Sequence, residues 1–148
     1  MYRHPNCPDA VARICGGTNA PCLSGQVRFY QECGSVLVVA EVTGFPDGNK
    51  NGFFALHIHE GDSCCGEGFP ATGGHYNPKG IPHPGHAGDL PPLLVCDGRA
   101  YLAVRTDRFR VSEIIGRTVV IHDGSDDFHS QPAGNAGAKI ACGVICRS

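Results

Sequence analysis

The chain has 148 residues, which is enough for one compact domain with a core of its own. Charged residues make up 18% of it and the formal net charge is −2, so it has no general attraction for nucleic acid or an anionic membrane surface. The longest apolar run, Val36–Ala40, is far too short to span a bilayer as a helix. We therefore expect a single domain, with neither nucleic acid nor a membrane as partner.

Short strands separated by turns are predicted in the first part of the chain. Residues 1–10 are expected to form a loose tail, and Ala10–Cys15 a first edge strand. Gln26–Gln31 alternates with a period of two, and the apolar run Val36–Val42 follows it after a turn, which predicts a hairpin. Phe53–His59 then has the composition of a strand.

Two long irregular segments are predicted in the rest of the chain. Residues 60–92 and 123–137 are interrupted by Gly and Pro and follow neither the helix period nor the strand period. Strand character returns at Arg99–Thr106 and Arg117–His122, with a helix-like or turn segment between them, and Lys139–Cys146 is the last strand. Short strands with long loops are typical of an all-β sandwich or barrel. A loop as long as 60–92 is uncommon unless it has a function.

A pair of histidines on one predicted strand is the first sign of that function. His57 and His59 are two residues apart, so both side chains point to one face of the strand, while Leu56 and Ile58 point to the other. One histidine in a strand is most often a polar residue with a hydrogen-bond partner. Two at this spacing, followed by more histidines in the next loop, favour a metal site.

Further candidate ligands follow the pair along the chain. His122 ends a predicted strand, and His75, His83, His86 and Asp89 lie in the long loop, which can curl until they converge on one ion. Two four-ligand sites need eight positions and these residues number seven, so one must bridge two metals, and His75 lies between the two groups. An all-imidazole set suits copper, and three histidines with a carboxylate suit zinc.

Six segments of the sequence resemble the copper/zinc superoxide dismutase family, and its bacterial branch most closely. They are Leu56–Asp62, Gly73–Pro78, His86–Pro91, Ile115–Asp123, Asp126–Phe128 and Gly134–Ile145. They follow the family's order along the chain. The resemblance implies a Greek-key β-barrel, a flattened antiparallel sandwich in which a long metal-binding loop and a second active-site loop hold copper and zinc.

The same resemblance implies the metal ligands. It implies copper on His57, His59, His75 and His122. It implies zinc on His75, His83, His86 and Asp89. It also implies that Asp126 links a copper histidine to a zinc histidine, and such partners fix the orientation of ligand rings. Only two residues separate His83 from His86, fewer than in most of the family.

Other implied features are a disulfide and a guiding charge. The disulfide would join Cys64 in the long loop to Cys142 in the last strand, with the adjacent Cys65 as a competitor for the same partner. Lys139 stands where the family usually has an arginine beside copper. A lysine keeps the charge that guides an anion but lacks the planar donor fork of arginine. We expect retained activity with weaker positioning of the anion.

The implied activity is disproportionation of superoxide to dioxygen and hydrogen peroxide by alternate reduction and oxidation of copper. His75 would take up a proton when its bond to reduced copper opens, and Lys139 would guide the anion. His75 and Lys139 are therefore the predicted catalytic residues. The alternative is a copper-binding or copper-delivery protein on the same fold with little turnover. Superoxide is the expected small-molecule partner, and the oligomeric state stays open, with a homodimer as one option.

The compartment is also left open by the sequence. No apolar stretch follows residues 1–5, so no signal peptide is visible and the chain as written is expected to be cytoplasmic, or secreted if a leader has been removed. Its nine cysteines favour an oxidising compartment instead, since disulfides are rare in the cytosol. The odd count leaves at least one unpaired, and we expect about half to be small buried hydrophobic residues.

Overall fold

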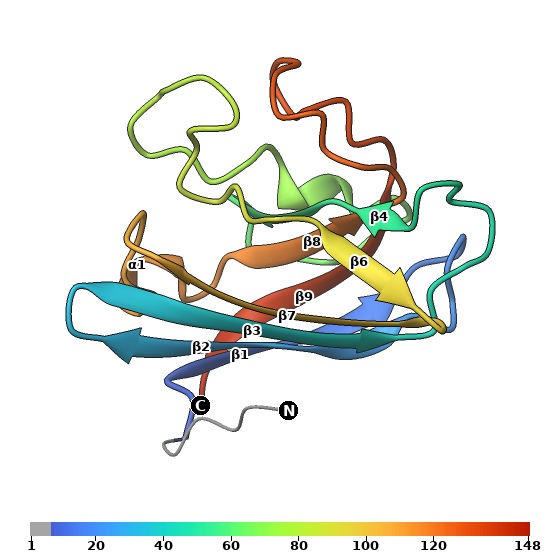
Figure 1. The fold of residues 1–148 in the computed structure, drawn as a ribbon. Coiled ribbons are helices and arrows are strands. Elements are labelled where there is room, and N and C mark those ends of the chain that lie inside the picture. Colours follow the sequence, from blue (N-terminus) through green and yellow to red (C-terminus); the bar gives the residue numbers. More distant parts are fainter. Residues whose placement is uncertain (1–6) are drawn as a thin grey trace.

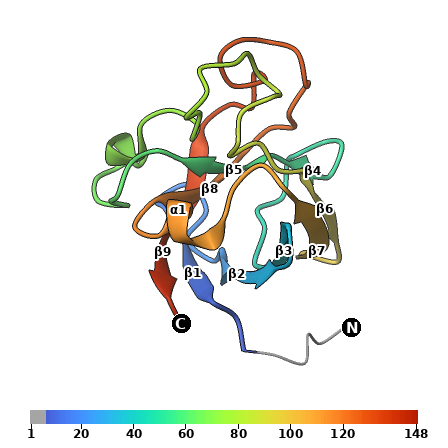
Figure 2. The same cartoon turned by 90° about the vertical axis from the view of Figure 1, so that its left-hand side faces the viewer.

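The computed structural model describes residues 7–148, which are almost entirely β-structure. Within these residues nine strands form one antiparallel sheet in the order β4-β6-β7-β3-β2-β1-β9-β8-β5, and the sheet curls into a nearly closed barrel (Figures 1 and 2). Its strands are β1 (Ala10–Gly16), β2 (Ser24–Glu32), β3 (Ser35–Thr43), β4 (Phe53–Phe54), β5 (Leu56–His59), β6 (Leu93–Cys96), β7 (Arg99–Thr106), β8 (Thr118–His122) and β9 (Lys139–Arg147). The expected all-β barrel is confirmed.

One short piece of chain supplies both edges of the sheet. Strand β4 lies at one edge and β5 at the other, and only Ala55 separates them in the sequence. The backbone of Ala55 accepts a hydrogen bond from His122 N at 3.0 Å and donates one to Gly124 O at 2.9 Å. The single strand predicted over Phe53–His59 is therefore wrong, because the chain changes partners at Ala55.

Strand β1 is not the edge strand that the sequence suggested. It pairs with β2 on one side and with β9 on the other. The predicted loose tail over 1–10 lies outside the described residues at 1–6. Its last part is bound, because Asp9 N donates to Phe29 O at 2.9 Å and Ala10 begins β1.

Strand β6 was not predicted, although a signal for it was present. It forms a hairpin with β7 through Asp97 and Gly98, whose φ angles are both positive, at 52° and 69°. Asp-Gly between two strands is a strong signal for such a turn. Residues 7–148 also contain two short helices: η1 (Pro70–Thr72) in the long loop, and α1 (Val111–Ile114) in the segment expected to be helix-like.

The core fills the inside of the barrel and leaves the histidines on its outside. Leu56 and Ile58 of β5 and Val119 and Ile121 of β8 are fully buried in the main apolar cluster. Their neighbours in sequence point outward, as the period of two requires. The loops 60–92 and 123–138 lie together on one side of the barrel (Figures 1 and 2), where they cover this outer face. No helix among the described residues is long and apolar enough to cross a membrane.

The core side chain between the two strand histidines gives a test of the barrel's stability. Ile58→Ala should lower the free energy of unfolding by about 2–5 kcal/mol, because Ile58 is fully buried and its truncation leaves a cavity. The same substitution at Ile81, which is 40% exposed, should change it by less than about 0.5 kcal/mol. Denaturant titration of the two variants measures the difference, and equal losses would contradict the assigned core.

Candidate metal centre

The two strand histidines lie on one face of β5, as predicted, and this is the outer face of the barrel. His57 is 0% and His59 2% exposed, and they stand opposite Val120 and Thr118 of β8. His122, at the end of β8, joins them where the register of the β8–β9 ladder shifts. Its Nε2 atom lies 3.2 Å from Nε2 of His59. The barrel alone therefore brings three imidazoles together.

The long loop completes the site because its backbone pairs with β5. Ile58 N donates to Gly88 O, and Tyr76 N donates to Ile58 O, both at 2.8 Å. These bonds place His75 next to His59 and Asp89 next to His57, as isolated β-bridges. Although the loop has no periodic sequence pattern, it is fixed against an edge strand.

Four ring nitrogens converge in the first cluster. The ligand atoms of His57, His59, His75 and His122 all lie within 4.8 Å of one another. The other nitrogen of three of these rings has an oxygen partner: His57 Nε2 at 2.9 Å from Asp126 Oδ2, His59 Nδ1 at 2.9 Å from Gly73 O, and His122 Nδ1 at 3.2 Å from Gly137 O. Donation to these oxygens leaves Nδ1 of His57 and Nε2 of His59 and His122 as free lone pairs facing the same point.

The second cluster shares His75 with the first. It contains His75, His83, His86 and Asp89, again with ligand atoms within 4.8 Å of one another. His75 Nδ1 lies 2.8 Å from Asp89 Oδ1 and 3.2 Å from His86 Nδ1. Because Nδ1 faces this cluster, Nε2, on the opposite side of the ring, is the nitrogen available to the first cluster. The structure thus brings all seven predicted ligand residues into two groups, with His75 in both.

Three buried nitrogens in these clusters test whether metal ions fit. His57 Nδ1, His75 Nε2 and His83 Nδ1 have no hydrogen-bond partner among the described residues. His83 Nδ1 is 3.0 Å from Asp89 Oδ2, yet the two do not form a hydrogen bond. A buried polar atom without a partner costs about 1–3 kcal/mol. Bound ions remove that cost, and the donor sets suit copper and zinc respectively.

Burial keeps the first cluster in the form that binds metal. It lowers the pKa of His59 to about 2 and that of His122 to about 3. These imidazoles are therefore neutral near pH 7 and offer a lone pair. Burial alone would raise the pKa of Asp89, but the hydrogen bond from His75 and the nearby imidazoles outweigh it, and the pKa is lowered. The second cluster accordingly contains a carboxylate.

Asp126 connects the two clusters. Its Oδ2 atom lies 2.9 Å from His57 Nε2, and its Oδ1 atom 2.8 Å from His83 Nε2. Burial opposes ionisation, but these two hydrogen bonds and one from Phe128 N lower the pKa of Asp126. Gly134 packs directly against this bridge, since a Cβ there would overlap Asp126 Oδ1 and come within 2.6 Å of His83 Nε2. A side chain at position 134 would push the bridge apart.

Two residues that support the second cluster were missed by the sequence reasoning. Gln131 holds the backbone of His83 on both sides: its Oε1 accepts from His83 N at 2.9 Å and its Nε2 donates to His83 O at 2.7 Å. Arg108 Nη1 donates to Pro84 O at 2.9 Å and to His86 O at 3.1 Å. No local sequence pattern predicts either contact, because each joins segments that are far apart in the chain.

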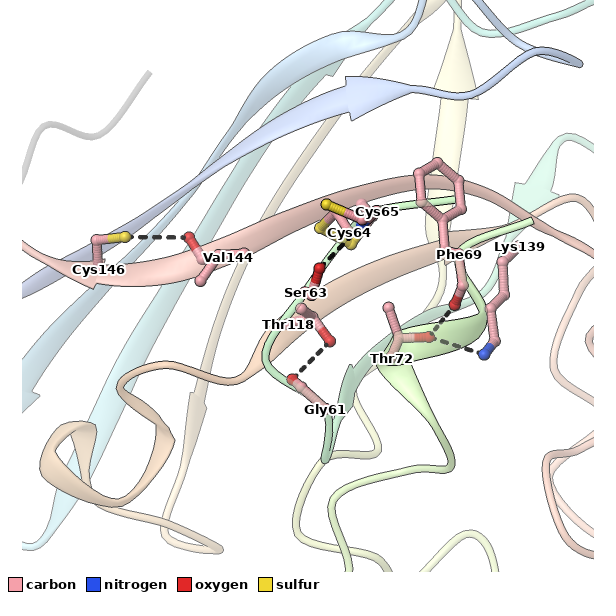
Figure 3. Close-up of a disulfide and its surroundings, with 11 residues drawn as sticks. Gly61, Ser63, Cys64, Cys65, Phe69, Thr72, Thr118, Lys139, Val144 and Cys146 are labelled. Carbon is pink, nitrogen blue, oxygen red and sulfur yellow. Dashed lines mark hydrogen bonds between the residues drawn. A yellow bond between two sulfur atoms is a disulfide. The ribbon is translucent and has the colours of Figure 1, made fainter. Parts of the chain in front are cut away.

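Lys139 and the disulfide fix the other end of the long loop. Lys139 Nζ donates to Thr72 Oγ1 at 2.7 Å (Figure 3) and to Gly73 O at 3.0 Å, and burial lowers its pKa. Gly73 O is also the acceptor for His59. The disulfide joins Cys64 to Cys142, and Cys65 is an exposed free thiol.

The remaining cysteines and histidines stand outside the clusters. Within the described residues seven cysteines are free and all are exposed, so the expectation that about half are buried is wrong. The side chain of His129 is 79% exposed, in keeping with a surface histidine. His4, the other histidine without an assigned role, lies outside the described residues.

Comparison with known proteins identifies relatives across most of the chain. The sequence model of the family described as "Copper/zinc superoxide dismutase (SODC)" matches residues 23–145. A Cu-Zn superoxide dismutase of Deinococcus radiodurans is 38% identical over 144 residues, covering 83% of this chain and 77% of the relative. A solved structure of a double mutant of a SOD-like protein from Bacillus subtilis has a TM-score of 0.77 at 25% identity, covering 92% of this chain and 96% of that one.

Other relatives are longer than this chain. An extracellular Cu-Zn superoxide dismutase of Rattus norvegicus is 38% identical over 84% of the chain, and a copper chaperone for superoxide dismutase of Sus scrofa is 34% identical over 95% of it. The chain spans only 55% and 54% of the length of these two proteins.

The close packing of Gly134 gives a test of the second cluster. Gly134→Ala should lower zinc affinity roughly 10- to 100-fold, because the new methyl group displaces Asp126 and His83. Gly80→Ala is the matched control: φ is positive at both positions, 69° and 61°, but nothing lies within 4 Å of a Cβ at Gly80. Competition titration of the metal-free proteins with a zinc chelator measures both affinities. An equal loss in the two variants would mean that backbone strain alone is responsible.

Proposed function

We propose that this chain, which belongs to the copper/zinc superoxide dismutase family, disproportionates superoxide to dioxygen and hydrogen peroxide. The observation that carries the proposal is the position of His75 in both clusters, with Nδ1 among the ligands of one and Nε2 unpartnered toward the other. A shared imidazole couples a redox-active ion to a second ion that orients the ring. A simple storage site would not need this arrangement.

The proposed ligands follow the two donor sets. Copper would be held by His57, His59, His75 and His122. Zinc would be held by His75, His83, His86 and Asp89. When bound, copper would supply the one-electron chemistry of the reaction. Asp126 keeps the rings of His57 and His83 in fixed orientation and tautomer.

The chain's own residues supply the proton and the attraction for the anion. His75 Nε2 is the proposed proton carrier, because it has no hydrogen-bond partner among the described residues and belongs to the one ring that both clusters share. The net charge of −2 repels superoxide, so a local positive charge must compensate. Lys139 is the proposed source of that charge. Two of its three N–H donors hold Thr72 and Gly73, which fixes the ammonium beside the carbonyl that orients His59.

A second candidate is a copper-binding or copper-delivery protein with little turnover. The relatives described as copper chaperones for superoxide dismutase favour it, since those of Sus scrofa and Homo sapiens are each 34% identical over 95% and 94% of this chain. The complete first cluster supports turnover instead, because a delivery site gains nothing from a shared ligand.

Metal content and turnover measured on one sample separate the two candidates. We expect about one copper and one zinc per chain, with dismutation that disappears when copper is chelated and returns on reconstitution. Copper bound with turnover near background would favour delivery. Zinc alone, with no uptake of copper on reconstitution, would contradict both.

The proposed role of Lys139 makes a separate prediction. Lys139→Gln should lower kcat/KM roughly tenfold and flatten its dependence on ionic strength, since steering by charge is screened by salt. Lys139→Arg should raise kcat/KM, because a guanidinium adds a planar fork of donors for the anion. Lys79→Gln is the control, an exposed lysine of the loop 60–92 that contains Thr72 and Gly73.

Stopped-flow assays over a range of salt concentrations measure the slopes for these three variants. Identical slopes for the wild type and Lys139→Gln would remove Lys139 from the mechanism. A loss as large in Lys79→Gln would show that net charge is responsible and that the position of the lysine is not.

A further inference from the structure

One row of residues across the sheet links the disulfide to an exposed thiol. On the strands β5, β8, β9 and β1 the cross-strand partners run His57, Val120, Cys142 and Cys15. Residues directly opposite each other in a ladder lie on the same face of the sheet. Cys15 therefore stands beside Cys142 on the outer face of the barrel. Cys142 is only 2% exposed, whereas Cys15 is exposed.

Cys142 has a second possible disulfide partner within reach. Directly opposed residues of an antiparallel ladder have Cα atoms about 4.5–5.5 Å apart. Disulfides span Cα separations of about 4.4–6.8 Å, and the Cα atoms of Cys64 and Cys142 are 5.8 Å apart. The register of β1 and β9 thus meets the same requirement for Cys15 and Cys142.

The two partners of Cys142 are held by different parts of the molecule. Cys64 lies in the long loop, 78 residues away in sequence. Cys15 is held by the β1–β9 ladder, which continues past it through the hydrogen bond from Gly17 N to Ile140 O at 2.8 Å. When the bond to Cys64 is open, that ladder still keeps Cys15 opposite Cys142.

We propose that Cys15 is the site at which small disulfides react with this chain, and that it passes the oxidation inward to Cys142 and Cys64. The Cys15 thiolate attacks a small disulfide, which forms a mixed disulfide and releases one thiolate. The Cys142 thiolate attacks Cys15 Sγ, which forms the Cys15–Cys142 bond and releases the second small thiolate. The Cys64 thiolate then attacks Cys142 Sγ, which forms Cys64–Cys142 and returns Cys15 as a thiolate.

Atoms and electrons balance over these three exchange steps. Two protein thiols are oxidised, one small disulfide is reduced to two thiols, and Cys15 ends as it began. Exposure together with the position opposite Cys142 selects Cys15 for the first step, because exchange needs an accessible thiolate and a partner within reach. Cys146 is also exposed and lies on β9, the strand of Cys142, but its partner in the ladder is Val11, so it has no route to Cys142.

The relay would set the position of the loop at the candidate metal centre. The Cys64–Cys142 disulfide packs with Phe69 and Val120 in one apolar cluster. Phe69 O accepts a hydrogen bond from Thr72 Oγ1 at 2.8 Å, and that same hydroxyl accepts from Lys139 (Figure 3). Closing the disulfide therefore holds the segment that orients Lys139.

Reoxidation kinetics test the relay without any activity assay. The fully reduced protein is mixed with oxidised glutathione, samples are quenched by alkylation, and the Cys64–Cys142 bond is followed by peptide mass mapping. Cys15→Ser should form this bond roughly tenfold more slowly than the wild type, because the accessible thiol is lost. Cys146→Ser is the matched control and should keep the wild-type rate. An unchanged rate in Cys15→Ser would overturn the proposal.

A trapping experiment identifies the intermediate. Cys64→Ser removes the last thiol of the sequence, so oxidised glutathione should convert this variant to a stable Cys15–Cys142 disulfide. Cys65→Ser tests the competing thiol beside Cys64 and should leave the wild-type rate unchanged. The proposal fails if the Cys64→Ser variant accumulates glutathione on Cys142 with no bond to Cys15, or if Cys65→Ser slows reoxidation while Cys15→Ser does not. Because Cys15 is exposed, its substitution leaves the fold intact, and the kinetic result stands by itself.

Discussion

The backbone of β5 is shared between the barrel and the long loop, and the metal centre depends on that sharing. As the last strand of the sheet, β5 pairs with β8 on one side and presents unpaired N–H and C=O groups on the other. Buried backbone groups must be satisfied, and at Ile58 the loop does this through Tyr76 and Gly88. The same bonds bring His75 and Asp89 beside the strand histidines. The same backbone hydrogen bonds therefore complete the sheet edge and bring the candidate ligands together.

The loop 123–138 is attached to the loop 60–92 by the carboxylate of Asp126 and by the side-chain amide of Gln131. Asp126 needs the imidazoles of His57 and His83 because its carboxylate is buried, and its other hydrogen bond, from Phe128 N to Oδ1, would leave Oδ2 without a partner. Gln131 adds a two-sided contact to the backbone of His83. Each cluster is therefore oriented by residues that bind no metal themselves, and both share the carboxylate of Asp126.

The sequence predicted those features that have a local pattern of residues, and it missed those that depend on contacts between distant segments. Composition predicted a strand over Phe53–His59, and the spacing of His57 and His59 predicted that both imidazoles share one face, because the period of two is a property of the backbone. The resemblance implied the seven residues that the structure brings together in the two clusters, and the partner of Cys142. The edge position expected for β1 was wrong because alternating exposure cannot tell an edge strand from an inner one that is solvated on one face. Gln131 and Arg108 were missed because their partners, His83 and Pro84, lie tens of residues away.

The barrel and the site differ in what they require from the sequence. The ladders that join β1, β2, β3, β7 and β9 contain none of the seven candidate ligands. The ligands come from β5 and β8, which lie at one end of the sheet, and from the loop that covers them. Substitutions in the loop can therefore alter the metal centre while most of the barrel keeps its hydrogen bonds. The cross-strand row from His57 to Cys15 connects these two parts, since it runs from the candidate site into the inner ladders. Through this row, the proposed oxidation of the exposed Cys15 thiol has a structural connection to the metal centre.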